Sequence, residues 1–437
     1  MKMMELGELK AFYTDHLFNT LVPFWMEEGI DWEKGGFFTC FSNDCERLVS
    51  TNKYVWSQGR FLWMLSRLAH EFGSYSDRYS RKAYLDAATC GAVFLKERAL
   101  LENGHAAWAL NREGKPIAVD RLGNVVEGGE LERGITADIF LIYGMGEYAR
   151  AAGKREFFDF ALTLFKSVDE RFRTNTYRWV PQAVPQGYRS HALSMIMLET
   201  AQELAAIAAY FKDPAEEQLL AISQASAETT VRYFLDEDEQ RLFEFVKESG
   251  ASAFDELLAS TINPGHALED AWFMLHWAMR SKDRKILNAG LKVVRWMTEI
   301  GAANEEGGIP QFMHKDGGRP RGAVLPIHEG TPVVTEIREN WYNRLWWVHS
   351  EALYALLLAY ELSGDEEYLD LYWPLHEYVF STFPNPDKEK GEWIQIRDQW
   401  GRPEDKVVAL PVKDPYHITR AFMHAIKSLE RILGRQK

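Results

Sequence analysis

Two short motifs, about 150 residues apart in the chain, each place a histidine in the first turn of a predicted helix. His266 stands two residues after Pro264, and His417 stands two residues after Pro415. An imidazole gains and loses a proton near neutral pH, so it can act as a general acid or a general base. Two imidazoles in one cavity suit a reaction that removes a proton from one face of a carbon atom and returns a proton to the opposite face.

Two further spacings place side chains with complementary chemistry on a shared helix face. Glu269 follows His266 by three residues, so its carboxylate is predicted to orient that imidazole and raise its basicity. Glu351 follows Trp347 by four residues. A flat indole packs on the C–H faces of a sugar, and a neighbouring carboxylate accepts hydrogen bonds from its hydroxyl groups, so this pair indicates sugar binding.

The starts of alternate predicted helices share a bias toward chemically active side chains. Besides the residues above, these starts carry Trp56, Arg60, Glu132, Arg133, Asp138, Arg189, His191, Arg344, Trp346 and Arg420. Arg60 and Arg420 could each stabilise an oxyanion or hold a hydroxyl group. Each residue alone has an ordinary explanation as a cap, a core residue or half of a salt bridge. Their recurrence at one end of successive helices predicts a shared site.

Apolar residues recur at helical spacing in twelve segments. The predicted helices are 6–28, 54–72, 78–99, 132–152, 155–172, 189–211, 214–235, 265–281, 283–299, 340–362, 366–382 and 415–434. Links within pairs are short, as at 153–154, which is typical of antiparallel helical hairpins. Links between pairs are long and carry Gly, Pro and short strand-like pieces, as at 100–131.

Alternate helices differ in how much of their surface is apolar. Segments 189–211 and 340–362 are apolar on most sides, as helices covered by other helices must be. This pattern predicts an all-α fold, an (α/α)6 barrel of six helical hairpins, with long loops and short β segments at one mouth. We expect residues 1–437 to form a single catalytic domain. The alternative is an α-solenoid, which usually has a regular repeat length and short loops on both sides. The sequence shows neither feature.

Composition excludes several classes of function. The formal net charge of −14 argues against nucleic acid and anionic membrane partners, which attract basic surfaces. Cys40, Cys45 and Cys90 are too few and too widely spaced for a disulfide framework or a zinc site, which favours a cytoplasmic protein. The sequence carries no His-x-x-x-His motif, no Walker loop and no glycine-rich dinucleotide motif, so we expect no metal and no required cofactor.

Taken together and in order, several motifs resemble the N-acylglucosamine 2-epimerase family. They are Tyr54-Val55-Trp56-Ser57-Gln58-Gly59-Arg60, Asn263-Pro264-Gly265-His266-Ala267-Leu268-Glu269, Leu345-Trp346-Trp347-Val348-His349-Ser350-Glu351-Ala352, Gly391-Glu392-Trp393 and Tyr416-His417-Ile418-Thr419-Arg420. The family includes cellobiose 2-epimerase and aldose–ketose isomerases of mannose and sulfoquinovose. Its fold is the (α/α)6 barrel, in agreement with the helix pattern.

The resemblance implies roles for individual residues. The two catalytic histidines of the family fall on His266 and His417, the arginine that stabilises the enediolate on Arg60, and the glutamate partner on Glu269. The substrate-binding candidates are Trp346, Trp347, Glu351, Lys413, Arg420, His191 and Trp56. Of these, Lys413 falls where family members vary with substrate, and His191 lies a turn before the position of a family histidine.

The implied activity is 2-epimerisation of a free reducing sugar of the N-acetylglucosamine/N-acetylmannosamine type. One histidine removes the C2 proton, a cis-enediolate forms, and the other histidine protonates the opposite face. Two departures bear on the substrate. No histidine stands shortly before Leu198-Glu199, which separates the chain from cellobiose epimerases, and Lys413-Asp414 replaces the Lys-Gly of many acylglucosamine epimerases.

Several alternatives stay open at the level of sequence. The same residues would serve an aldose–ketose isomerase of the mannose/fructose type, if one histidine returned the proton to C1. Less favoured are a disaccharide 2-epimerase, a glycoside hydrolase using Asp138 and Glu351, and a non-catalytic binding protein. The expected partner is a small sugar, with no nucleic acid and no membrane. Exposed outer helices favour a homodimer, and some family members are activated by a nucleotide, whose site the sequence does not place.

Overall fold

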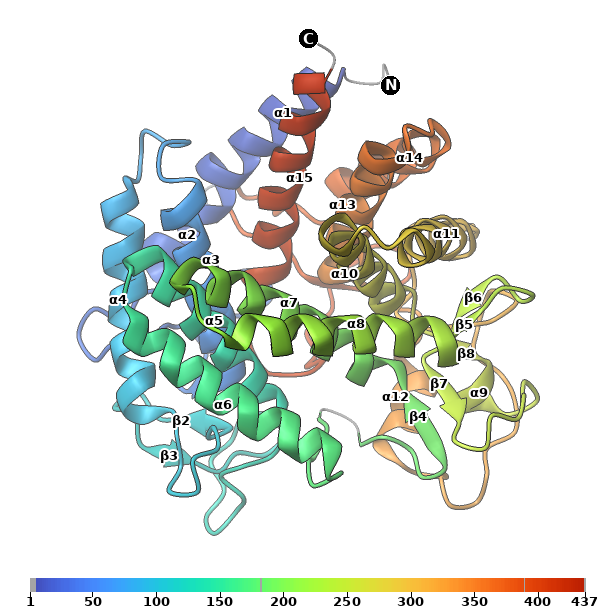
Figure 1. Ribbon diagram of the computed structural model, residues 1–437, viewed down its shortest axis with the longest axis horizontal. Coiled ribbons are helices and arrows are strands. Elements are labelled where there is room, and N and C mark those ends of the chain that lie inside the picture. Colours follow the sequence, from blue (N-terminus) through green and yellow to red (C-terminus); the bar gives the residue numbers. More distant parts are fainter. Residues whose placement is uncertain (1–4, 181–182, 389, 436–437) are drawn as a thin grey trace.

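Helices with most of their residues buried form a closed inner ring (Figure 1). The computed structural model describes residues 5–180, 183–388 and 390–435. The inner ring consists of α3 (Val55–Glu71), α5 (Thr136–Ala152), α7 (His191–Phe211), α10 (Pro264–Ser281), α13 (Trp346–Ser363) and α15 (Tyr416–Arg435). Each of these helices contacts the next, and α15 contacts α3. The predicted (α/α)6 barrel is therefore confirmed.

An outer layer of helices covers the ring. Its members are α4 (Arg81–Arg98), α6 (Arg155–Arg173), α8 (Ala215–Tyr233), α11 (Arg284–Ala302) and α14 (Glu367–Thr382), and each packs on the inner helix that precedes it in the chain. The remaining outer position is filled by α1 (Leu6–Asp15), the π-helical η1 (His16–Leu21) and α2 (Val22–Glu28). Of these, α1 and η1 contact α15, so this pair joins segments about 400 residues apart rather than a sequential hairpin.

Short strands fix the starts of the inner helices at the mouth. The strands β1 (Lys53–Tyr54), β4 (Tyr188–Ser190), β8 (Thr261–Ile262) and β10 (Arg344–Leu345) stand immediately before α3, α7, α10 and α13. They pair antiparallel with β2 (Ala109–Leu110), β7 (Phe245–Lys247), β9 (Met313–His314) and β11 (Ile396–Arg397), respectively. A third strand, β3 (Pro116–Ile117), extends the first sheet, and β5 (Leu235–Asp236) pairs with β6 (Arg241–Leu242).

The loops, short strands and two additional helices gather at one end of the barrel. In Figure 1 the labelled strands, α9 (Leu257–Ser260) and α12 (Pro332–Asn340) lie from the middle to the bottom of the view, whereas both chain ends lie at the top. The prediction of short β segments at one mouth is confirmed. Because the ladder bonds hold the backbone just before α3, α7, α10 and α13 start, the first turns of these four inner helices are held rigidly.

Two predicted helices begin later than the sequence pattern indicates. The predicted segment 132–152 begins as α5 at Thr136, and the segment 340–362 begins as α13 at Trp346. Before α13, the chain instead forms α12 and β10, and β10 pairs with β11 about 50 residues away. Such long-range pairing overrides local helical preference, which a single window of sequence cannot reveal.

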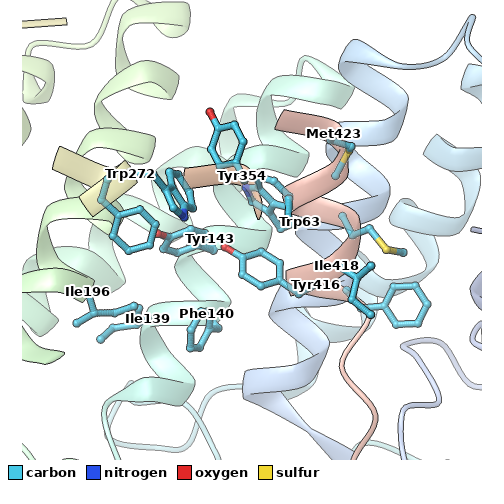
Figure 2. Packing of buried hydrophobic residues seen from close by; sticks show 14 of the residues in the cluster. Trp63, Ile139, Phe140, Tyr143, Ile196, Trp272, Tyr354, Tyr416, Ile418 and Met423 are labelled. Carbon is cyan, nitrogen blue, oxygen red and sulfur yellow. The ribbon is translucent and has the colours of Figure 1, made fainter. Parts of the chain in front are cut away.

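Aromatic side chains from the inner helices fill the barrel axis (Figure 2). Trp63, Tyr143, Trp272, Tyr354 and Tyr416 come from five different inner helices, and all are buried. Among the described helices, only α7 is long and apolar enough to cross a membrane, and 78% of its most apolar window is buried inside the protein. Its apolar character therefore matches its place between the outer helices and this core.

Helices α3 and α5 approach each other closely through two glycines. A Cβ atom added to Gly144 would lie 2.5 Å from the backbone oxygen of Gly59, and one added to Gly59 would lie 2.1 Å from the backbone oxygen of Phe140. The obstructing atoms belong to helix backbones, which cannot move without separating the two helices. This contact brings the start of α3, and with it Arg60, against α5.

We expect Gly144→Ala to lower the free energy of unfolding by about 1–3 kcal/mol, the usual effect of overpacking a tight contact. Urea denaturation followed by circular dichroism would measure it. The matched control is Gly7→Ala in α1, where nothing lies within 4 Å of an added Cβ atom, so that variant should be neutral or slightly stabilised. An unfolding midpoint for Gly144→Ala equal to that of the control would contradict the close-contact argument.

Candidate active site

The first turn of α10 is shaped to present His266. The side chain of Asn263 caps the helix by accepting a hydrogen bond from the His266 backbone N–H at 3.2 Å. Pro264 occupies the first helical position, where a missing N–H costs nothing. A Cβ atom on Gly265 would lie 2.5 Å from the ring of Trp347, so only glycine allows this turn to lie against that indole.

The start of α15 is fixed by an equally specific set of bonds. The Asp414 carboxylate accepts the backbone N–H of Tyr416 at 3.0 Å. The side-chain amide of Gln395 then holds the Asp414 backbone on both sides, donating to its carbonyl at 2.9 Å and accepting from its N–H at 3.0 Å. The residue immediately before β11 therefore holds the turn that carries His417.

Both histidines line one cavity of about 200 Å³ at the mouth of the barrel. Among the predicted site residues, the cavity is also lined by Arg60, Glu269, Trp56, Trp346, Trp347 and Arg420. The Trp347 indole lies between the imidazoles, with ring centroids 5.5 Å from His266 and 5.6 Å from His417. Two motifs far apart in the sequence thus meet at one small space.

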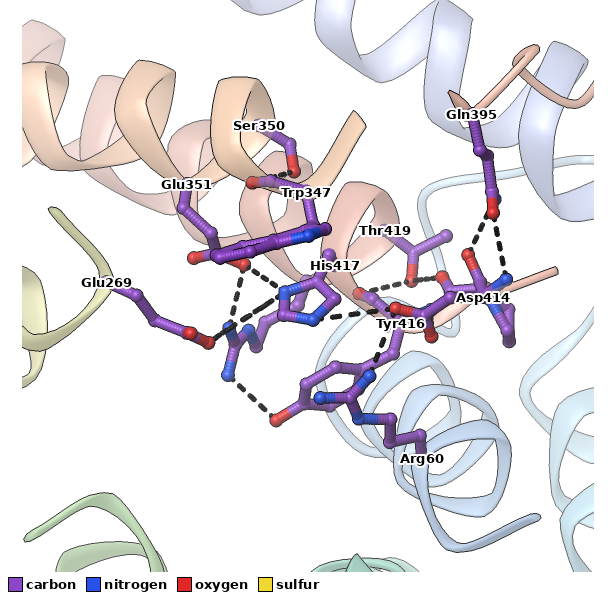
Figure 3. Close-up of polar contacts among 12 residues, drawn as sticks. Arg60, Glu269, Trp347, Ser350, Glu351, Gln395, Asp414, Tyr416, His417 and Thr419 are labelled. Atoms are coloured by element: carbon purple, nitrogen blue, oxygen red, sulfur yellow. Dashed lines mark hydrogen bonds and ion pairs between the residues drawn. The ribbon is translucent and has the colours of Figure 1, made fainter. Parts of the chain in front are cut away.

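His417 is held as a neutral base. Its Nδ1 lies 2.7 Å from Glu351 Oε1, and because a carboxylate has no hydrogen to donate, Nδ1–H is the donor (Figure 3). The other ring nitrogen, Nε2, then carries a free lone pair. Burial, aided by the charge of Arg60, lowers the pKa of His417 to about 3, although Asp414 and Glu269 oppose the shift.

His266 lies in the opposite electrostatic environment. Its Nδ1 lies 3.0 Å from a carboxylate oxygen of the buried Glu244. Burial alone would lower the pKa of His266, but the charge and hydrogen bond of Glu244, with smaller effects from Glu269 and Asp270, raise it above its usual value. His266 therefore keeps a proton at pH values where His417 is neutral.

A buried arginine organises the carboxylates behind His417. Arg420 Nη2 donates to Glu269 and, at 2.7 Å, to Glu351, while Nη1 donates to the Tyr416 hydroxyl at 2.8 Å. The remaining oxygen of Glu351 accepts the indole N–H of Trp272 at 2.7 Å. The prediction that Glu269 orients His266 was therefore wrong, since Glu269 bonds Arg420 and Glu244 orients His266, but the charge of Glu269 does raise the pKa of His266 as expected.

The same cluster has the composition of a metal site but already contains a cation. Ligand atoms of Glu269, Glu351 and His417 lie within 4.8 Å of one another. The Arg420 guanidinium is hydrogen-bonded to both carboxylates, so it supplies the positive charge that a metal ion would otherwise bring. Arg420 also lies over the Trp272 ring, 4.8 Å from its centroid.

Arg60 directs a second guanidinium at the cavity. Its Nη1 lies 3.3 Å from Asp414 Oδ2, and its guanidinium carbon lies 4.0 Å from the centroid of the Phe140 ring. The indole N–H groups of Trp56 and Trp346, which also line the cavity, have no hydrogen-bond partner among the described residues. Two indole N–H groups and the Arg60 guanidinium can therefore donate hydrogen bonds to a ligand beside His417.

Three predicted substrate-binding residues do not line the cavity, and their prediction is corrected. His191 is buried behind it, with Nε2 2.7 Å from an Asp270 oxygen. The Lys413 ammonium donates to the backbone oxygens of Asn43 at 2.8 Å and Trp393 at 2.7 Å, so it ties loops together. Glu351 acts from behind His417. His191 was selected at a helix start, Glu351 by its spacing from Trp347, and Lys413 through the family resemblance, and none of these signals tells a buried support from a cavity wall.

Sequence reasoning missed three residues of the site. Trp272, the donor to Glu351, lies three residues after Glu269, so the same-face spacing rule could have found it. Asp414 stands three residues before His417 in the quoted motif, yet it was not selected. Glu244 carries no local signal, since it reaches His266 only through the pairing of β4 with β7.

The arrangement can transfer protons at a carbon atom. A neutral imidazole with a free Nε2, a second imidazole that retains its proton, and the Arg60 guanidinium all line one small, largely apolar space. A base can take a proton from a carbon next to a carbonyl group if the resulting oxyanion is stabilised, and an acid can then protonate the other face.

Comparisons with known proteins agree with this chemistry. A family model described as N-acylglucosamine 2-epimerase (GlcNAc 2-epimerase) matches residues 36–421. The N-acylglucosamine 2-epimerase of Bos taurus is 28% identical over 427 residues, which cover 95% of this chain and 90% of that protein. The cellobiose 2-epimerase of Dictyoglomus turgidum is 24% identical over 450 residues, covering 98% of this chain and 100% of that protein.

Solved structures share the fold at lower sequence identity. A cellobiose 2-epimerase from Bacillus thermoamylovorans superposes with a TM-score of 0.75 at 20% identity, covering 96% of this chain and 99% of that chain. A D-mannose isomerase superposes with a TM-score of 0.71 at 17% identity, covering 96% of this chain and 98% of that chain. These similarities establish the barrel architecture.

We predict that the two imidazoles titrate in different pH ranges. In NMR spectra of ¹⁵N-labelled protein, His266 should titrate above pH 6.5, the ordinary histidine value, and His417 should stay neutral from pH 8 to pH 5. Glu244→Gln removes the carboxylate that raises the pKa of His266, so that titration should move to lower pH while His417 is unaffected. His266→Gln and His417→Gln assign the signals. Coincident titration of the two rings would refute the asymmetry.

Proposed function

This chain belongs to the N-acylglucosamine 2-epimerase family, and on that basis we propose that it interconverts N-acetylglucosamine and N-acetylmannosamine, or a closely similar pair of free N-acylated hexoses. It is an isomerase of the sugar 2-epimerase class. The observation that carries the proposal is the pair His266 and His417 lining one cavity in opposite proton states.

In the proposed mechanism His417 is the first base. With the sugar in its open-chain aldehyde form, His417 Nε2 removes the C2 proton, which the neighbouring carbonyl group makes acidic. Negative charge develops on O1, and Arg60 stabilises it in the largely apolar cavity. The resulting cis-enediolate is planar at C2, so it can be protonated on either face.

His266 completes the proposed inversion. It starts protonated, because Glu244 raises its pKa, and it delivers that proton to the face of C2 opposite His417. The Trp347 indole, flanked by both rings, offers a flat surface against which the sugar can lie between the acid and the base. The reverse reaction uses the same two groups with their roles exchanged.

The size and lining of the cavity support a monosaccharide substrate. Its volume of about 200 Å³ is below the roughly 300–1,000 Å³ of sites for drug-sized ligands. One wall is apolar and includes Met195, Ile196 and Phe273, which suits the methyl group of an N-acyl substituent. A second cavity of about 1270 Å³ shares Trp179, Val180, Val184 and Ser190 with its lining, so a disaccharide would have to extend into that neighbouring space.

The main alternative is an aldose–ketose isomerase of the mannose/fructose type, in which one imidazole carries the proton from C2 to C1. The presence of a second, protonated imidazole beside the same indole favours the epimerase. The glycoside hydrolase alternative lacks support, because neither Asp138 nor Glu351 lines the cavity. Asp138 is buried against Arg171 and the backbone N–H of Ala106.

The cytoplasmic location, the homodimer, the independence of a cofactor and the nucleotide activation of some family members stay predictions from the sequence. None of them is needed for the proton transfers described above.

The substrate assignment is tested by incubating N-acetylglucosamine, N-acetylmannosamine, mannose, glucose and cellobiose with the enzyme in D₂O. We expect deuterium at C2 of both N-acetylated epimers by NMR, because the proton returned to C2 comes from an imidazole that exchanges with solvent. Deuterium only at C1 of a ketose would favour the isomerase. An absence of exchange with every aldose would falsify both proposals.

The histidine roles are tested by His266→Ala and His417→Ala. Each should lower the rate of epimerisation by about 10²–10⁴-fold, the usual contribution of a general acid or base. The matched control is His105→Ala, since His105 pairs with Glu132 and does not line the cavity. Circular dichroism verifies the fold, and a wild-type rate of epimerisation in either variant would rule out its assigned role.

A further inference from the structure

Three polar atoms converge on one part of the cavity wall (Figure 3). Asp414 Oδ2 lies 3.5 Å from His417 Nε2 and 3.3 Å from Arg60 Nη1. The mechanism described above uses His417 and Arg60 and assigns nothing to Asp414. Yet Asp414 lines the cavity, and one of its oxygens is adjacent to the base that would attack C2.

A free hexose imposes a requirement that the two imidazoles do not meet. In water it exists almost entirely as a closed ring, whereas the C2 proton becomes acidic only when C1 is a carbonyl carbon. Ring opening transfers a proton from the C1 hydroxyl, O1, to the ring oxygen, O5. Both oxygens are bonded to C1, so a single group placed beside C1 can reach both.

We propose that Asp414 opens the sugar ring by carrying the proton from O1 to O5, a role that rests on the proposed epimerase function. Asp414 Oδ2 takes the proton of O1–H, and the electron pair of that bond forms the C1=O1 double bond. The C1–O5 bond breaks, its electron pair moves to O5, and O5 takes the proton back from Asp414. The carboxylate is regenerated, and no other reactant is consumed.

The protonation states of the two imidazoles show why ring opening requires a third group. If His417 took the O1 proton, it would be charged and could not remove the C2 proton. If His266 gave its proton to O5, it would have none left to return to C2. Ring opening by a separate group leaves both imidazoles in the states that epimerisation needs.

Among the cavity carboxylates, Asp414 is the one beside the groups that act at C1 and C2. The acidic residues that line the cavity within the described parts of the chain are Glu244, Glu269 and Asp414. Glu244 is bonded to His266, and Glu269 is bonded to Arg420. Within the described residues, the contacts of Asp414 Oδ2 are 3.3 Å to Arg60 and 3.5 Å to His417 Nε2, both longer than strong charged hydrogen bonds.

The rest of the Asp414 side chain and backbone is rigidly fixed. Oδ1 accepts the Tyr416 backbone N–H, and Gln395 bonds the Asp414 backbone at both N–H and C=O. Only Oδ2 is therefore directed at the reacting end of the sugar. Arg60 lies beside Asp414 Oδ2, which in turn lies beside His417. After the ring opens, Arg60 can therefore donate a hydrogen bond to the new carbonyl oxygen O1.

The test separates ring opening from epimerisation. Two-dimensional exchange NMR at C1 measures how fast the enzyme interconverts the α and β anomers of N-acetylglucosamine, while deuterium uptake at C2 measures epimerisation. Wild-type enzyme should accelerate both. Asp414→Asn should lower enzyme-catalysed anomer interconversion by about 10²-fold and epimerisation with it. His266→Ala should lose formation of the epimer but still open the ring.

The matched control is Asp398→Asn, since Asp398 also accepts backbone N–H groups and pairs with an arginine, Arg402, but does not line the cavity. It should behave as wild type. If Asp414→Asn folds poorly, Asp414→Ser retains a capping oxygen without the carboxylate. Wild-type anomer interconversion in either Asp414 variant, or none in the wild type, overturns the inference. If the wild-type enzyme shows no C2 exchange, the epimerase proposal itself is refuted.

Discussion

The active site depends on the buried positive charge of Arg420. Its guanidinium bonds carboxylates from two neighbouring helices, Glu269 of α10 and Glu351 of α13, while it is itself carried by α15. A charge removed from water is strongly destabilising without such partners, so the three helices must meet here for any of these groups to be buried. The same contact places Glu351 against His417. One ion cluster thereby joins closure of the barrel to the orientation of the base.

The two histidines show how tertiary environment separates residues with similar local sequences. Both follow a proline-containing turn and both start an inner helix. Both imidazoles are buried and both contact a carboxylate. At His417, burial and the charge of Arg60 outweigh the nearby carboxylates and lower the pKa, whereas at His266 the charge and hydrogen bond of Glu244 outweigh burial and raise the pKa. The proposed base and acid therefore arise from the same residue type at two similarly placed helix starts.

Local spacing predicted the elements of the barrel and the end at which the site lies, because apolar periodicity and the turns that start helices are local properties. Local spacing also placed Trp347 at the same end of the barrel as His266 and His417. It failed to predict the partners of side chains, because these depend on which helix faces a given residue. Glu269 shares a face with His266, but that face meets Arg420, and Glu244 arrives through strand pairing. His191 and Lys413 look like site residues by charge, yet their partners are a buried carboxylate and two loop carbonyls.

The place of α15 at the far end of the ring determines when during synthesis the proposed acid and base can meet. A ribosome releases the chain from its N-terminal end, so Arg60 and His266 leave the exit tunnel long before His417 and Arg420. Until α15 emerges, the ring stays open between α13 and α3, α1 lacks its partner, and the carboxylates of Glu269 and Glu351 lack their cation. Under the proposed mechanism, a growing polypeptide therefore has no activity until the helix that completes the ring has been made.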